Sequence, residues 1–140
     1  MQLQLPGERD PAVLTALGDD DPRIAALGLR EALKHCPPAA VSRVAELALE
    51  TEASEEVRCL AASALGQVRQ PGALGALLKL ADGGRSFLGR RKLPPLTPVV
   101  IASIKALAQQ RAADRLAVSI LATAARSSDP EVREAAQGGS

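Results

Sequence analysis

The chain has 140 residues, enough for one domain, and 27 Ala plus 21 Leu stand against 9 Val, 4 Ile and a single aromatic residue. Ala and Leu are strong helix formers, and β-branched and aromatic residues fill sheets, so this composition predicts an all-α protein and disfavours sheet-based nucleotide folds. The net charge is +1, so no overall electric field attracts the protein to nucleic acid. With one His, two Cys and no Trp or Tyr, the chain also lacks most of the side chains that usually form catalytic and metal sites.

The first predicted elements are a lone helix at about residues 10–18 and a helix pair at 22–52. The pair begins at Asp21-Pro22, where a capping side chain precedes a proline in the first turn, a common helix start. Its first helix ends before Pro37, because proline disfavours helical geometry in the preceding residue and has no N–H to donate. We interpret the three acids at 19–21 as part of a helix start, with negative charge near the positive helix end, rather than as a cation site.

Two further helix pairs are predicted at 54–82 and 97–127, and another helix from Asp129-Pro130. Ser54-Glu55 and Thr97-Pro98 repeat the same kind of helix start. The first helix of the second pair carries an apolar stripe with a period of about 3.6 residues. That stripe recurs 32 residues earlier and 42 residues later, so the chain is predicted to repeat one antiparallel helix pair. The residues expected in the core are Leu33, Leu65, Leu77, Leu107 and Ile120.

Residues 54–66 and 128–136 share one pattern: an acidic or proline-led start, then Val-Arg, then Ala-rich packing positions. The pattern resembles the first helix of HEAT repeats, particularly the bacterial phycobiliprotein-lyase-like kind, and the resemblance spans about residues 10–137. It implies a single all-α domain, 1–140, folded as an α-α superhelix of three helix pairs with half-repeats at both ends. Such repeats serve mostly as surfaces for protein partners, and the unpaired terminal helices would fit a longer array.

The third repeat departs from this pattern, because Ile101 stands where Arg58 and Arg133 stand in the other copies. We therefore expect no continuous ladder of arginines between the repeats.

An insert, residues 83–96, separates the second and third pairs, and its three glycines and two prolines argue against a helix. Residues 79–115 carry 8 basic and 2 acidic side chains, whereas residues 1–78 carry 7 and 11. Clustered arginines suit carboxylate and phosphate groups, so the insert is a candidate site for an acidic partner or anion. The alternatives are a disordered segment and a connector whose Phe87, Leu88 and Leu93 pack against helix ends. The candidate site residues are Arg85, Phe87, Arg90, Arg91 and Lys92.

His35 and the two cysteines show no catalytic pattern. His35 falls in the last turn of a predicted helix, where it complements the negative helix end, and the sequence places no nucleophile or carboxylate to relay protons with it. Cys36 and Cys59 fit neither a disulfide framework nor a zinc pattern. Stacked parallel first helices would hold them roughly 13 Å apart, too far for a disulfide. We expect no cofactor and no metal, and two reduced thiols.

These features predict a non-catalytic scaffold or adaptor that binds another protein. The partner is expected to be acidic where it contacts the insert. Without a signal peptide or an apolar run of membrane-spanning length, a cytoplasmic protein without membrane contact is expected. Two alternatives stay open. One is electrostatic binding of nucleic acid or a phosphate-bearing ligand through the insert, although nucleic acid is not the expected partner; the other is the phycobilin-lyase-like role that the resemblance implies. If the insert is only a connector, binding would use a groove of second helices around Arg43, Glu46, Lys79 and Arg115.

Overall fold

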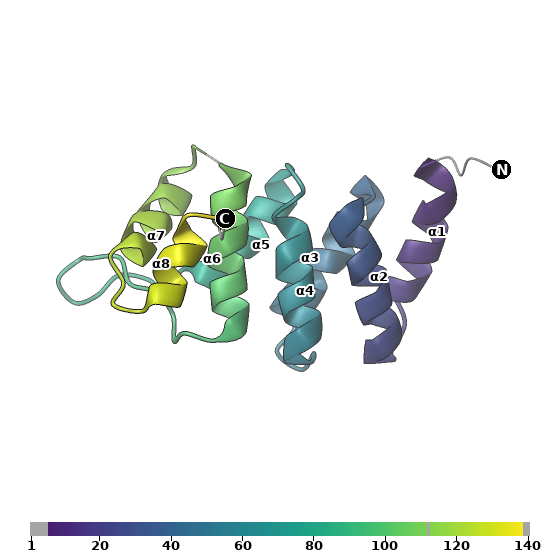
Figure 1. Ribbon diagram of the computed structural model, residues 1–140, viewed down its shortest axis with the longest axis horizontal. Helices are drawn as coiled ribbons and strands as arrows, with labels where there is room; N and C mark the ends of the chain where they lie inside the picture. Colours follow the sequence, from purple (N-terminus) through teal and green to yellow (C-terminus); the bar gives the residue numbers. More distant parts are fainter. Residues whose placement is uncertain (1–5, 112, 139–140) are drawn as a thin grey trace.

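A computed structural model describes residues 6–111 and 113–138, which form eight α-helices and no strand (Figure 1). One isolated antiparallel bridge, between Arg85 and Arg91, is the only β pairing within these residues. The prediction of an all-α protein is thus confirmed. The helices are α1 (Pro6–Leu17), α2 (Pro22–Lys34), α3 (Val41–Leu49), α4 (Glu55–Leu65), α5 (Pro71–Ala81), α6 (Pro98–Gln110), α7 (Arg115–Ala125) and α8 (Pro130–Ala136), with a 3-10 turn, η1 (Pro38–Ala40), before α3.

The helices form two layers, as an α-α superhelix requires. In the first layer α2 packs on α4, α4 on α6 and α6 on α8. In the second layer α3 packs on α5 and α5 on α7, while α1 contacts η1. Each second-layer helix also packs against the next first-layer helix, so α1 is a second helix without its first and α8 is a first helix without its second. The half-repeats expected at both ends are therefore present.

The predicted helix starts are confirmed with one exception. Four side chains accept a hydrogen bond from a backbone N–H in the first turn of the helix that follows them, namely Asp21, Ser54, Thr97 and Asp129. The exception is the first helix, which begins at Pro6 rather than near Asp10 and contains Pro11 in its interior. Proline at position 6 suits the first turn as well as Pro11 does, and the sequence pattern alone did not separate the two.

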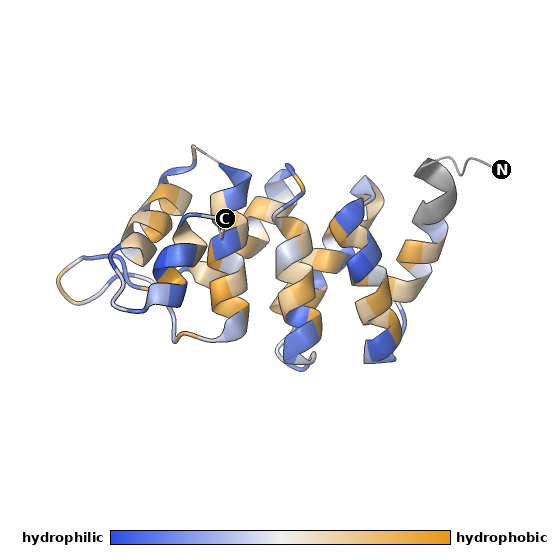
Figure 2. Cartoon of the chain, in the orientation of Figure 1, coloured by the Kyte–Doolittle hydropathy of each residue, from blue (hydrophilic) through white to orange (hydrophobic). Residues whose placement is uncertain are grey.

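The apolar stripes of both layers meet in one continuous core, and Figure 2 shows hydrophobic and hydrophilic residues alternating along the helices. Leu65, Leu77, Leu107 and Ile120 are fully buried, as predicted. Leu33 is only half-buried, so that expectation was wrong. In α2 the core positions are Leu29 and Ala32, and Leu33 instead lines a shallow depression between the ends of α2 and α4.

Helices α4 and α6 approach each other closely because small residues face each other. A Cβ added at Gly66 would lie 2.9 Å from the Cβ of Ala106. Beside this contact the buried amide of Gln110 donates to the backbone carbonyls of Leu65, the last residue of α4, and of Val68, just beyond the helix. Gln110 stands where the apolar stripe of α4 has Val68, so a hydrogen-bonding side chain replaces an apolar one at the corresponding position.

Arginines from neighbouring helices hydrogen-bond to carbonyl groups at the ends of second-layer helices. Arg58 in α4 donates from Nε to the carbonyl oxygen of Ala48 in α3, at 3.1 Å. Arg133 in α8 donates to the carbonyl oxygen of Ser127, just beyond α7, at 2.8 Å. A cation at the negative end of a helix is stabilising. Each arginine serves its own junction, and no ladder of arginines joins the described repeats.

Candidate protein-binding surface

The insert, residues 83–96, begins as a short hairpin. The N–H of Gly83 donates to the carbonyl of Lys92 at 3.0 Å, and the N–H of Lys92 donates to the carbonyl of Gly84 at 2.9 Å. Gly84 and Gly89 adopt φ angles of 80° and 79°, in the left-handed region that favours glycine. The chain therefore reverses direction around residues 86–89. We call residues 83–92 the insert hairpin.

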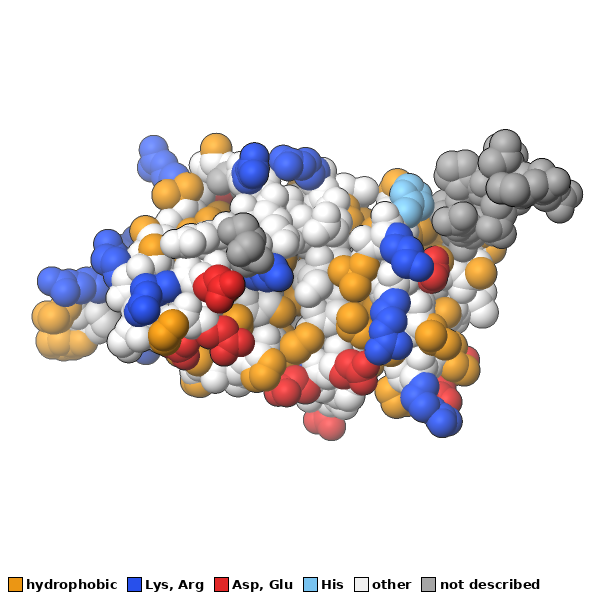
Figure 3. Space-filling view, viewed as in Figure 1, with side chains coloured by type: hydrophobic (Ala, Val, Ile, Leu, Met, Phe, Trp, Pro, Cys, Tyr) orange, Lys and Arg blue, Asp and Glu red, His pale blue; other side chains and the backbone are white. Residues whose placement is uncertain are grey.

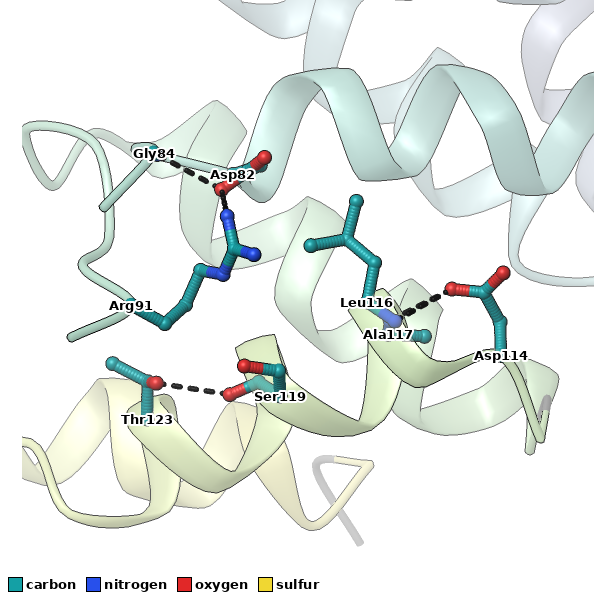
Figure 4. A network of polar contacts seen from close by, with 8 residues as sticks. All are labelled: Asp82, Gly84, Arg91, Asp114, Leu116, Ala117, Ser119 and Thr123. Carbon is teal, nitrogen blue, oxygen red and sulfur yellow. Dashed lines mark hydrogen bonds and ion pairs between the residues drawn. The ribbon is translucent and has the colours of Figure 1, made fainter. Parts of the chain in front are cut away.

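Asp82 and Arg91 join the two sides of the insert hairpin at its base (Figure 4). The Arg91 guanidinium lies 2.8 Å from Oδ1 of Asp82, and the two side chains are 17% and 25% exposed. The same carboxylate oxygen accepts the N–H of Gly84 at 2.8 Å. Leu93 packs against the core just after the hairpin. Arg91 therefore holds the hairpin in place, and the structure removes it from the exposed cluster that the sequence suggested.

Phe87 and Leu88 form the tip of the insert hairpin and point into solvent, with 102% and 77% of their surface exposed. The connector hypothesis, in which both would pack against helix ends, is wrong for these two residues and holds only for Leu93. The paired base carries the tip away from α5, and Figure 1 shows the loop projecting at the end of the solenoid opposite α1. The only aromatic side chain of the protein is thus fully presented to solvent.

Arg85 and Arg90 flank this tip, and Lys92 lies at the hairpin base; all three are exposed, and none of them forms an ion pair with a described residue. In Figure 3, Lys and Arg side chains gather at this end of the molecule, with hydrophobic side chains at its outermost point. Of the five candidate residues of the insert, three therefore lie at or beside the exposed tip. We call Arg85, Phe87, Leu88 and Arg90 the tip surface; sequence reasoning had not assigned Leu88 to it.

The groove residues proposed as the alternative surface do not form one cluster. Arg43 donates from Nε to the carbonyl oxygen of Leu17 at the end of α1, at 2.9 Å, and pairs with Glu46 at 3.2 Å. Lys79 on α5 and Arg115 on α7 are exposed and pair with no described residue. Arg43 thus has a structural contact of its own, and the use of a groove by a partner stays a prediction.

His35 and the two cysteines, for which the sequence shows no catalytic pattern, lie at or within the first-layer helices α2 and α4. His35 is exposed and caps α2, and its backbone N–H donates to Glu31 at 3.0 Å. Cys36 and Cys59 are free and half-buried, as expected. Burial raises the pKa of both thiols; for Cys59 the Glu55 carboxylate raises the pKa further, and Arg58 opposes it. A raised pKa disfavours the nucleophilic thiolate. The lyase-like role stays a prediction to which the thiol environments add nothing.

The acids at 19–21 form a helix start, as interpreted. Asp19 accepts the N–H of Asp21 at 2.8 Å, and Asp21 accepts the N–H of Arg23 at 2.9 Å. The hydrogen bond from the Arg23 side chain, followed by the one from its backbone, lowers the pKa of Asp21. Among the described residues, no three His, Cys, Asp or Glu side chains gather as a metal site would need.

None of the described helices has both the length and the apolar character that crossing a bilayer requires. No curated protein matches the chain. A family model for HEAT repeats matches residues 11–92, which is more than half of the sequence. The match covers most of α1, all of α2 to α5 and the whole insert hairpin, and the two-layer packing continues through α8. The chain therefore belongs to the HEAT-repeat family.

Proposed function

We propose that this protein is a non-catalytic scaffold that binds another protein through the tip surface of its insert hairpin. One observation carries the proposal: Phe87 and Leu88 are exposed at the end of a hairpin whose base is held by backbone hydrogen bonds and by the Asp82–Arg91 pair. Buried aromatic anchors dominate the energetics of many protein interfaces. HEAT-repeat proteins commonly act as surfaces for partners, which agrees with this assignment.

The geometry favours binding because the apolar anchor is held in place before a partner arrives. A hairpin that is already ordered loses less conformational entropy on association than a flexible loop does. Arg85 and Arg90 flank the anchor and would steer an acidic protein surface toward it. The partner is therefore proposed to carry an apolar pocket with acidic residues at its rim.

A second candidate is binding of a nucleic acid or another phosphate-bearing ligand, favoured by three unpaired cations of the insert hairpin, Arg85, Arg90 and Lys92. Binding through phosphates would weaken steeply with salt, because each neutralised phosphate releases counterions. Contact through Phe87 and Leu88 depends far less on salt. Proteins that bind single strands also stack successive bases on several aromatic side chains, and this chain has one aromatic residue.

The experiment compares native binding partners retained by three immobilised forms of the chain. The test variant is Phe87→Ser with Leu88→Ser, and the control is Val118→Ser, which removes an apolar side chain that is 53% exposed on α7. We expect a partner retained by the parent and by the control but lost by the test variant, with little change of binding in raised salt. A partner retained equally by all three forms, or lost only at raised salt, would contradict the proposal.

A further inference from the structure

A cleft lies between the insert and α7, on surfaces that do not include Phe87 or Leu88. Its volume is about 1400 Å³. One wall is the insert from Arg90 to Leu96 with the hairpin base, and the other is α7 with the turn that follows it. Figure 4 shows the hairpin side with Arg91 and the α7 side with Ser119 and Thr123. Sequence reasoning missed this cleft, because its two walls are about thirty residues apart in the chain.

The charges of this cleft are one-sided. Asp82 is the single acidic residue that lines it, and that carboxylate is already paired with Arg91. Three further cations line the cleft without a partner among the described residues: Arg90, Lys92 and Arg126. Arg126 caps the end of α7 and is exposed. Three unpaired cations that line one cleft favour an anionic occupant, which would pair with them.

The two walls of the cleft differ in their uncharged residues. Leu93, Pro94, Pro95 and Leu96 contribute an apolar insert wall, whereas Ala122 on the α7 side stands among hydroxyl side chains, namely Ser119, Thr123, Ser127 and Ser128. The two prolines have no N–H, so the insert wall cannot form the hydrogen-bond ladder by which a peptide adds a strand to a sheet. At this wall an occupant is therefore recognised through its side chains, with apolar groups against the wall and carboxylates toward the cations.

We propose that the cleft binds an extended acidic segment of the protein partner, one that alternates carboxylates with apolar side chains. The cleft exceeds the roughly 300–1000 Å³ of a small-molecule pocket, which suits several residues of a peptide better than a single anion. This inference rests on the proposed function because it names the part of the partner that is recognised. The tip surface and the cleft are tested by different variants, so either can fail alone.

The probe is a phage-displayed library of random peptides selected on the full chain, followed by fluorescence anisotropy with the enriched peptides. The test variant is Lys92→Ser with Arg126→Ser. The control is Lys105→Ser with Arg111→Ser, which removes the same charge from two exposed residues outside the cleft. A further variant, Ala122→Trp, fills the cleft without changing its charge. Thermal melting checks that all variants fold.

We expect the enriched peptides to be rich in Asp, Glu and apolar residues. Their affinity should fall about tenfold or more in the Lys92/Arg126 variant, which corresponds to two partly exposed ion pairs, and stay unchanged in the control. Ala122→Trp should weaken the same peptides, because a tryptophan in the cleft excludes them.

Four results would overturn the inference: no enriched peptide, enriched peptides without acidic residues, equal loss of affinity in the control, or a single-stranded oligonucleotide that displaces the peptides from the parent at equal concentration. Loss of peptide binding only in the Phe87→Ser, Leu88→Ser variant would also overturn it, while leaving the proposed function intact. Conversely, a peptide bound in the cleft by a chain whose tip variant keeps its native partner would contradict the proposed function alone.

Discussion

Two junctions between repeats can be compared directly: α3 to α4, joined by residues 50–54, and α5 to α6, joined by residues 82–97. At the short junction Arg58, from the following first-layer helix, hydrogen-bonds to the end of α3. At the long junction the residue of α6 at the same distance from the helix cap is Ile101, which cannot make this bond. Here Arg91, from the insert, pairs with Asp82 at the end of α5. An arginine is thus present at the end of the second helix in both cases, but it comes from a different part of the chain.

The difference shows what holds each junction in place. Arg58 belongs to a helix that is already fixed by the core, so the short connection adds little of its own. The insert hairpin instead depends on one ion pair, a few backbone hydrogen bonds and the packing of Leu93. We therefore expect the short junction to unfold with the whole molecule and the insert hairpin to open separately, as locally less stable segments do.

The largest effect is expected from Leu65→Ala at the end of α4, compared with Leu93→Ala in the insert. Leu65 is fully buried, so its truncation should lower the free energy of unfolding by about 2–5 kcal/mol. Leu93 is half-buried, and its truncation should cost roughly 1 kcal/mol. Chemical denaturation of both variants measures the difference. Equal losses would show that the insert is as much a part of the core as α4.

Replacing either arginine of the two junctions by alanine should have a smaller effect, and a different one at each junction. Arg58→Ala leaves the Ala48 carbonyl without this donor and should lower global stability by about 1–3 kcal/mol. Arg91→Ala should mainly speed amide hydrogen exchange at Gly83 and Lys92, whose N–H groups form the base of the hairpin. Arg85→Ala, which removes an exposed cation from the same hairpin, is the control. Unchanged exchange in Arg91→Ala would mean that the ion pair does not hold the insert.

Gly66, at the contact between α4 and α6, can be compared with Gly75 in α5, where an added side chain meets nothing. Gly66→Ala would place a methyl group 2.9 Å from the Cβ of Ala106, so we expect a loss of about 1–3 kcal/mol from overpacking. Gly75 in α5 has no neighbouring atom within 4 Å of an added Cβ. Gly75→Ala should therefore raise stability by about 0.5–1 kcal/mol through helix propensity. The melting temperature should fall in Gly66→Ala and rise in Gly75→Ala. A rise in both variants would show that α4 and α6 can separate at little cost.

The smallest effect is a pH dependence of stability that arises in the N-terminal half of the chain, which contains both cysteines. Because burial raises the pKa of the two thiols, the folded state holds their protons more tightly than the unfolded chain does. The resulting stability is fully present below the unfolded thiol pKa of about 8.5 and is lost as pH rises through the raised folded values. Denaturation at increasing alkaline pH should show a steeper loss in the parent than in Cys36→Ala with Cys59→Ala. The chain has no tyrosine to titrate in the same range. Parallel losses would contradict the burial of the thiols.

Much of the fold could be predicted from the sequence because its signals are local. A capping side chain such as Asp21 or Thr97 lies next to the helix that it starts, and the apolar period of each helix is visible within one segment. Leu33 was misplaced because two adjacent apolar residues can both fit the stripe, and only the neighbouring helices decide which one is buried. Gln110 breaks the apolar stripe of α6, and the sequence gives no sign that its amide satisfies the carbonyl groups of Leu65 and Val68 at the end of α4.

The site was harder to predict, because its geometry depends on contacts within and beyond an irregular segment. Composition identified the basic insert and its aromatic residue, and these form the tip surface. The pairing of Arg91 with Asp82 across the hairpin has no periodic signal, so all four basic residues looked equivalent. The cleft against α7 requires the spatial order of repeats, which only the packing of the helices supplies.

The closed base of the insert hairpin has a consequence for protein engineering. The hydrogen bonds of Gly83, Gly84 and Lys92, together with the Asp82–Arg91 pair, fix the two ends of the segment that runs through residues 85–90. A foreign recognition loop grafted between these ends would be joined to the protein at two fixed positions that lie outside the helices. Loop-closure entropy grows slowly, by about 0.6 kcal/mol for each doubling of length. The repeat scaffold could thus carry loops of varied length and specificity at this position while its helices stay unchanged.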